Sequence, residues 1–238
     1  MMNRPYIICH MTTSIDGKVT GDFLFRDECS EAIEEYYQIN RNLKCDGFIC
    51  GRVTMEGSFT QGYYPDLSQY KAVKPEPCRV DYVLDKEKLS GFYAVAFDTN
   101  GKLGWKSNMI IDPDGDPGYD GAQIIEVLSE NVDERYLGYL ESMEIPYIFA
   151  GENKIDVKNA LFKLKNLFGI DKLLLEGGSV INGAFLRVDA VDELSLVIAP
   201  TIADEDSKTL FADSKITDFT LTNSYTKNDV VVLKLKRR

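Results

Sequence analysis

The chain has 238 residues, with 27 lysines and arginines against 38 aspartates and glutamates, which gives a formal net charge of −11 at pH 7. This charge argues against a nucleic-acid surface, although backbone amides can still hold a phosphorylated ligand. No apolar run reaches the length of a membrane span, and the N-terminal residues lack the apolar core of a signal peptide, so we expect a cytoplasmic protein without membrane contact.

In the first third of the chain, residues 5–11 predict a buried strand that passes into a loop with an Asp16-Gly17 turn. From spacing alone, the favoured interpretation of Asp16 is a local Asx turn, and an active-site role is the alternative. Residues 30–43 predict a helix. Residues 48–50 predict a strand that leads through Gly51 into a second helix, where Thr54 can act as a cap or contact a phosphate.

The middle of the chain contains a polar surface segment, two strands and a long loop. Residues 61–77 are polar and tyrosine-rich, and residues 80–84 and 93–98 predict strands. Trp105, the only tryptophan, is interpreted as a packing residue. Residues 113–121 are rich in Asp, Gly and Pro and predict a loop.

The remaining elements alternate between strand and helix. Residues 123–128 and 147–150 predict strands, while 133–143 and 157–168 predict helices, the latter closed by Gly169. A strand at 172–175, the run Glu176-Gly177-Gly178, a helix and a second strand follow. This order usually places the two strands side by side and parallel. Residues 219–225 and 230–236 predict a terminal β-hairpin. The whole pattern predicts one α/β domain over residues 1–238, with a mainly parallel mixed sheet and an antiparallel edge.

Three strand ends are candidate ligand sites, namely Asp16, residues 51–54 and residues 176–178. Ligands of open α/β sheets bind at the carboxyl ends of strands, and glycines at such an end leave room for a diphosphate. The GxGxxG fingerprint and the GxxxxGK[ST] loop are both absent. Five cysteines without a CxxC pair argue against a zinc site, and a single histidine makes any Ser–His–Asp or Cys–His hydrolase depend on His10.

Three blocks of the sequence, PYIICHMTTSIDGKVTG, CDGFICGRVT and LLLEGGSVINGAFLRVDAVDELSLVIAP, resemble one family. That family is the reductase domain of bacterial riboflavin-biosynthesis deaminase-reductases and its stand-alone relatives. The resemblance covers nearly the whole chain and implies a dihydrofolate-reductase-like, three-layer α/β/α fold, a homodimer and an NADPH-dependent reductase of a phosphorylated pyrimidine.

The resemblance also implies roles for particular residues. Gly51, Thr54, Gly177 and Gly178 would line the NADPH diphosphate, and Ser129 would lie near the adenosine ribose. Thr12, Ser14, Asp16 and Glu176 would bind the substrate, with Asp16 and Glu176 as the catalytic carboxylates. Asp192 and Glu193 are assigned to structure, and no residue is assigned to a metal.

The chain departs from the family pattern in three places. Glu130 follows Ser129 and would repel a 2′-phosphate, which keeps NADH as an alternative donor. The Asp-Asp-Pro-x-Leu-Thr run of the riboflavin reductases is replaced by MEGSFTQGYYPDL, and no deaminase zinc signature is present. Three alternatives therefore stay open: a pterin reductase, a non-catalytic dinucleotide-binding protein, and an α/β domain whose glycine junctions are only turns.

Overall fold

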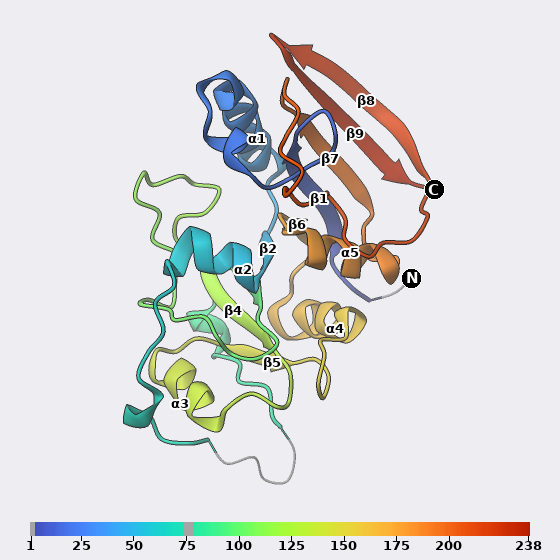
Figure 1. Ribbon diagram of the computed structural model, residues 1–238. Coiled ribbons are helices and arrows are strands. Elements are labelled where there is room, and N and C mark those ends of the chain that lie inside the picture. Colours follow the sequence, from blue (N-terminus) through green and yellow to red (C-terminus); the bar gives the residue numbers. More distant parts are fainter. Residues whose placement is uncertain (1–2, 74–78) are drawn as a thin grey trace. The chain divides into compact units, whose positions relative to one another are not determined.

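The computed structural model describes residues 3–73 and 79–238, which divide into two compact units (Figure 1). Unit 1 contains Asp46–Asp171 and the N-terminal residues up to Pro5. Unit 2 contains Tyr6–Cys45 and Lys172–Arg238. The end of the predicted surface segment, residues 74–77, and Cys78 lie outside the described residues.

Unit 1 has a sheet of four parallel strands in the order β5-β4-β3-β2. Nearly every residue of these strands is buried, which explains their continuous apolar sequences. The strands are β2 (Gly47–Gly51), β3 (Tyr93–Phe97), β4 (Gln123–Leu128) and β5 (Tyr147–Phe149). The predicted strands at these four places are confirmed.

Helices cover both faces of this sheet. Tyr147 of β5 points to one face and donates a hydrogen bond to Glu141 of α3. Tyr93 of β3 points to the other face, where its ring meets Phe168 of α4. The helices of unit 1 are α2 (Arg52–Met55), α3 (Glu134–Ser142), α4 (Val157–Phe168), the π-helix η3 (Glu56–Thr60), and the 3-10 helices η4 (Leu67–Gln69) and η5 (Lys86–Lys88).

The prediction of a strand over residues 80–84 is wrong. Only Tyr82 forms a bridge there, in antiparallel pairing with Tyr147. The next residue back, Asp81, turns its carboxylate to the backbone N–H of Phe149 and to Lys163, so a side chain replaces the backbone partner that a strand would supply. The alternation of residue types in the sequence cannot show that a side chain takes the place of a backbone partner.

Unit 2 has a mixed sheet in the order β6-β1-β7-β9-β8, parallel from β6 to β7 and antiparallel from β7 to β8. β6 and β7 are parallel but not side by side, because β1 pairs with both of them. The expectation that they are neighbours is therefore wrong, whereas the predicted C-terminal hairpin is confirmed. The strands are β1 (Tyr6–Thr13), β6 (Lys172–Leu175), β7 (Glu193–Ile198), β8 (Phe219–Lys227) and β9 (Val230–Arg237).

Alternate residues of this sheet point to α1. Its core cluster joins Ala32 and Ile39 of the helix to Val197 of β7 and Val232 of β9. Asp192 accepts a hydrogen bond from the N–H of Ile7 and so holds β1 beside β7, which agrees with its assignment to structure. The helices of unit 2 are α1 (Ser30–Leu43), α5 (Ser179–Arg187), η1 (Asp22–Phe25) and η2 (Asp27–Cys29). No helix within the described ranges is long and apolar enough to cross a membrane.

Candidate functional site

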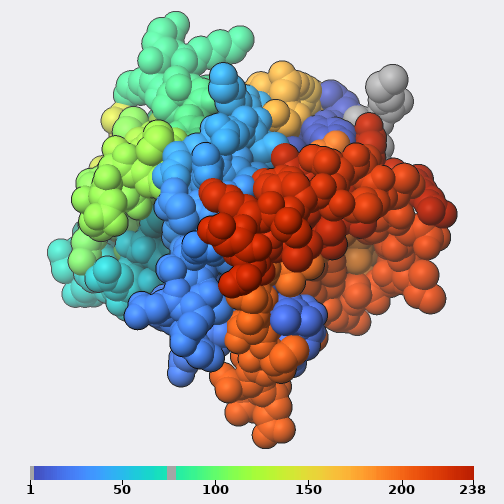
Figure 2. Space-filling view, turned by 90° about the horizontal axis from the view of Figure 1, so that it is seen from above, coloured from blue at the N-terminus to red at the C-terminus, as the bar shows by residue number. Residues whose placement is uncertain are grey.

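The loop after β1 is organised by hydrogen bonds of Asp16. Its Oδ1 accepts a hydrogen bond from Ser14 Oγ at 2.6 Å and from the backbone N–H of Ala203 at 3.1 Å. The local Asx turn favoured for Asp16 is therefore not what forms, because the carboxylate joins two loops of unit 2. The space-filling view shows the segment around Ala203 against the residues that follow β1 (Figure 2).

The same contacts fix the charge of Asp16. The hydrogen bond from Ser14 lowers the pKa of the exposed Asp16 carboxyl group, and the Ala203 N–H lowers it further. Asp16 is therefore ionised at neutral pH, which suits it to accept hydrogen bonds from a substrate and to orient it. Beside it, Thr12 is buried, and no hydrogen-bond partner for its Oγ1 lies within the described residues.

Glu176 lies at the carboxyl end of β6 and is only 7% exposed. Its Oε1 accepts a hydrogen bond of 2.7 Å from the amide of Asn40, a buried residue of α1. Burial raises the pKa of the nearby Cys9 thiol, and the charge of Glu176 raises it further, so Cys9 is an inert thiol. Sequence reasoning did not identify Asn40, and a single polar residue within a helix gives no specific signal.

The turn from β6 into α5 is built from Gly177 and Gly178, joined by a cis peptide bond. Gly177 has φ of +93°, and a Cβ atom added to it would lie 3.0 Å from Met11 Cε, so only glycine fits there. Gly178 is the N-cap of α5 and forms no side-chain cap. The first N–H groups of the helix are therefore left for another acceptor.

Two buried side-chain oxygens belong to the same helix start. Ser179 Oγ and Asn182 Oδ1 are both shielded from solvent, and neither has a hydrogen-bond partner in the described part of the chain. A nine-residue helix with an uncapped N-terminus, a glycine turn and an unpartnered serine hydroxyl that can donate suits an anionic group such as a diphosphate. The predicted residues Gly177 and Gly178 thus fit the cofactor expected from the sequence.

In unit 1, Gly51 ends β2 and Ser129 follows β4, both at the carboxyl edge of the parallel strands. Gly51 is the N-cap of α2, and Thr54 lies in the first turn of that helix without forming a cap. Ser129 is 1% exposed, and its Oγ lacks a hydrogen-bond partner within residues 3–73 and 79–238. Glu130 is exposed directly after it. This edge is where ligands of parallel α/β sheets bind.

A pair of buried carboxyl groups in unit 1 was not identified from the sequence. Asp98, directly after β3, accepts hydrogen bonds from the backbone N–H groups of Lys102 and Leu103. Glu126 of β4 accepts from the Trp105 indole at 2.5 Å and from the Tyr136 hydroxyl at 3.3 Å. Burial raises the pKa of Glu126 well above its usual value, and the charge of Asp98 raises it further. An acidic residue within an apolar strand is the signal that could have found Glu126.

His10 does not form a hydrolase site. It is completely buried, with Nδ1 3.0 Å from Ser195 Oγ, Nε2 3.0 Å from the carbonyl oxygen of Tyr36, and its ring stacked on the Tyr36 ring. Burial lowers the pKa of His10 to about 4, so the imidazole is neutral. Nε2 holds α1 on the sheet through the Tyr36 carbonyl oxygen. The serine beside Nδ1, Ser195 of β7, is itself buried, so no exposed nucleophile lies at the ring.

The residues singled out from the sequence are thus divided between the two units. Unit 2 carries Thr12, Ser14, Asp16, Glu176, Gly177 and Gly178, and unit 1 carries Gly51, Thr54 and Ser129. In each unit they lie at or near the carboxyl ends of parallel strands. This arrangement defines a class: α/β proteins that bind a phosphorylated ligand at strand ends.

Part of the chain matches a known protein family. Residues 118–233 match the family described as the RibD C-terminal domain, which confirms the resemblance inferred from the three sequence blocks. Two curated relatives are named 2,5-diamino-6-ribosylamino-4(3H)-pyrimidinone 5′-phosphate reductase. The one from Methanothermobacter thermautotrophicus is 24% identical and covers 98% of this chain and 92% of its own. The relative from Aquifex aeolicus is 27% identical, and the match covers 84% of this chain and 79% of that relative.

Solved structures confirm the fold class, with its mostly parallel mixed sheet and antiparallel C-terminal strands. A pyrimidine reductase-like protein from Corynebacterium diphtheriae has a TM-score of 0.67 at 20% identity, over 99% of this chain and 93% of that one. RibD from Acinetobacter baumannii has a TM-score of 0.64 at 18% identity over 99% of this chain. The present chain spans only 58% of the length of that RibD protein.

Proposed function

We propose that this chain is a dinucleotide-dependent reductase of 2,5-diamino-6-ribosylamino-4(3H)-pyrimidinone 5′-phosphate, acting in riboflavin biosynthesis. The observation that carries the proposal is similarity to two curated reductases of this name over 98% and 84% of the chain. The uncapped start of α5 and its unpartnered Ser179 Oγ support a site for the phosphate groups of a nucleotide.

Each site residue has a role in this proposal. In unit 2, Gly177 and Gly178 bind phosphate of the dinucleotide. In unit 1, Gly51 and Thr54 are assigned to phosphate binding and Ser129 to the adenosine ribose. The dinucleotide supplies the hydride when bound. NADPH is the proposed donor, and NADH is the alternative because the exposed Glu130 carboxylate disfavours a 2′-phosphate.

The protein's own contribution is to orient the substrate. Asp16, ionised and held by Ser14, accepts hydrogen bonds from the substrate, and Glu176 lies buried at the end of β6 with Asn40 fixing its position. Cys9 and Cys29 are free thiols, which supports a reducing, cytoplasmic location.

The test is an assay of NADPH and NADH oxidation with the named pyrimidine phosphate, beside dihydrofolate. Turnover of the pyrimidine supports the proposal, and turnover of dihydrofolate alone replaces it with the pterin reductase. Asp16→Asn is expected to lower turnover at least about tenfold while nucleotide binding is kept. Asp206→Asn, at an exposed position, is the matched control. Nucleotide binding without oxidation of either substrate would favour the non-catalytic alternative.

A homodimer is also part of the proposal. The sheet face of unit 2 opposite the α1 cluster pairs Leu196 with Leu233 and Ile198 with Val231, and these four side chains are half-buried. A second copy would remove this apolar strip from water. Light scattering on the purified protein tests the dimer. The wild type is expected to have twice the mass of one chain, and Leu233→Glu the mass of a single chain. A monomeric wild type would contradict the proposed dimer.

A further inference from the structure

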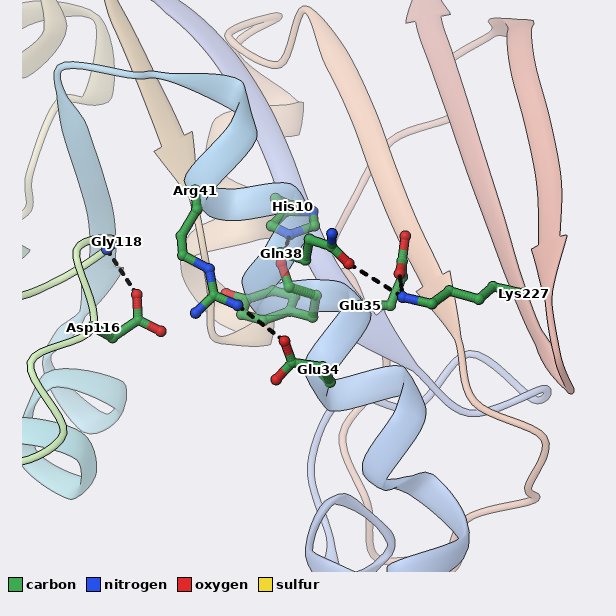
Figure 3. Close-up of polar contacts among 9 residues, drawn as sticks. His10, Glu34, Glu35, Gln38, Arg41, Asp116, Gly118 and Lys227 are labelled. Carbon is green, nitrogen blue, oxygen red and sulfur yellow. Dashed lines mark hydrogen bonds and ion pairs between the residues drawn. The ribbon is translucent and has the colours of Figure 1, made fainter.

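A groove in unit 2 lies between α1 and the C-terminal hairpin. Residues of α1 at helical spacing line one side, and residues of β8 and β9 line the other, around a cavity of about 290 Å³. Figure 3 shows Glu35 and Gln38 on α1 reaching toward Lys227 of the hairpin. The lining residues are Glu35, Gln38, Ile39, Asn42, Leu43, Tyr225, Lys227 and Lys234.

The acceptors of Glu35 and Gln38 in this groove are already used. Glu35 is 5% exposed, and its two carboxylate oxygens accept from the Tyr225 hydroxyl at 2.6 Å and from Lys227 Nζ at 2.5 Å. Gln38 Oε1 accepts from the same Lys227 at 3.2 Å. Burial alone would raise the pKa of Glu35, but the hydrogen bonds from Lys227 and Tyr225 outweigh it and lower the pKa. Glu35 and Lys227 therefore cancel in charge.

Three other donors of the groove are not used. Lys234 is half-buried, and its ammonium group forms no ion pair or hydrogen bond with any residue that the structure describes. The amide of the exposed Asn42 and the Nε2 group of Gln38 likewise have no partner within the described ranges. The open donors of the groove are therefore one ammonium and two amide groups, beside the amide oxygen of Asn42, with Ile39 and Leu43 as the apolar part of the lining.

We propose that this groove binds a small oxyanion, the phosphate or carboxylate group of a metabolite, through Lys234, Gln38 and Asn42. Two lysines against one glutamate give the lining a positive excess, on a chain whose net charge is −11. A cavity of about 290 Å³ is at the small end of ligand pockets, so the ligand is one small molecule. This site contains none of the residues assigned to the reductase reaction, and anion binding there would be a property additional to that reaction.

A purely structural role for Lys234 is the competing explanation. The charge of Lys234 lowers the pKa of Glu35. Lys234 also lies near the last turn of α1, where a cation interacts favourably with the helix dipole. That role predicts a loss of stability when the charge is removed, but no change in anion binding. The two explanations therefore differ in the ligand dependence of the variants.

The test is a thermal-shift titration with sodium phosphate, and separately with sodium acetate, with chloride balancing the ionic strength. The dissociation constant of phosphate or acetate is expected to rise about tenfold or more in Lys234→Met, through loss of a charge-assisted hydrogen bond. Asn42→Asp places a negative charge in the same groove and is also expected to raise the dissociation constant of both anions. Lys236→Met is the matched control, because Lys236 is exposed on the same strand, does not line the groove, and should stay within about twofold of wild type.

Equal binding of both anions by wild type, Lys234→Met and Lys236→Met would overturn the proposal, because the ions would then bind elsewhere, for example at the Gly177-Gly178 turn. A lower melting temperature of Lys234→Met with unchanged binding would overturn it in favour of the structural role. If Lys234→Met does not fold, Asn42→Asp decides, since Asn42 is an exposed helix residue. Failure of the reductase assay has no bearing on these outcomes.

Discussion

Glu126 is a carboxyl group that unit 1 surrounds completely with protein. Its Oε1 receives the Trp105 indole and the Tyr136 hydroxyl, while no described residue hydrogen-bonds its Oε2. Burial and the charge of Asp98 both disfavour the ionised form, so the pKa of Glu126 is raised above its value in the unfolded chain. In the unfolded chain the same group is ionised, and folding is therefore linked to proton uptake.

The first prediction concerns pH. Because the folded-state pKa of Glu126 lies above the unfolded value, its contribution to the free energy of unfolding is present below the unfolded pKa and is lost as pH rises toward the folded pKa. Glu126→Gln removes this titration, so the variant is expected to gain stability relative to wild type as pH is raised from about 5 to about 9. Urea unfolding followed by circular dichroism at each pH measures it.

Its control is Glu152→Gln, which changes an exposed carboxyl group of the same unit and should leave the pH dependence as in wild type. Parallel pH curves for wild type and Glu126→Gln would contradict the linkage.

Among the elements, α4 shows how much a sequence can determine on its own. The helix runs over Val157–Phe168, as predicted, because a capping residue precedes it and Gly169 ends it in the left-handed conformation with φ of +71°. Asp156 accepts hydrogen bonds from the N–H groups of Lys158 at 2.8 Å and Asn159 at 3.2 Å. These two bonds satisfy donors that the helix cannot satisfy itself.

The second prediction follows from this cap. Asp156→Ala removes both bonds and is expected to lower the free energy of unfolding by about 1 kcal/mol. Asp156→Asn keeps a capping oxygen and should stay within about 0.5 kcal/mol of wild type. Chemical denaturation of the three proteins measures the difference, and an equal loss in both variants would show that charge, not the cap, is responsible.

Elements defined by local pattern could be predicted, whereas their pairing could not. The bounds of α1 and α4, the strand before each glycine junction and the terminal hairpin follow from periodicity and caps. The insertion of β1 between β6 and β7 depends on distant partners, as does the replacement of a strand at residues 80–84 by the side chain of Asp81. The same limit applies to the site: Asp16 and Glu176 could be found at strand ends, but Ala203 and Asn40, which hold them, lie far away in the sequence.

At the scale of the whole molecule, the excess of acidic residues is the dominant electrostatic fact. A net charge of −11 opposes compaction through self-repulsion. Among the residues that the structure describes, a few ion pairs, such as Lys163 with Asp81, are partly buried. Mobile ions screen this repulsion over about 10 Å at 0.1 M salt. The stability of the protein is therefore tied to ionic strength.

The third prediction is that the melting temperature rises when sodium chloride is increased from about 10 mM to about 300 mM at pH 7. Scanning calorimetry measures it. The same series near pH 4.7, the sequence isoelectric point, provides the comparison, because the net charge there is close to zero and the gain should largely disappear. A salt response of equal size at both pH values would argue against self-repulsion as its cause.

The position of Trp105 gives this protein a built-in optical label. It is the only tryptophan of the chain, it is buried against Glu126, and it belongs to unit 1, so its emission follows the melting of that unit while unit 2 remains silent. Far-ultraviolet circular dichroism records both units together. If the two signals change over one common transition, the 238 residues melt as the single domain that the sequence predicts. If they separate, each unit has a melting temperature of its own, and a substitution can be assigned to the unit that it weakens.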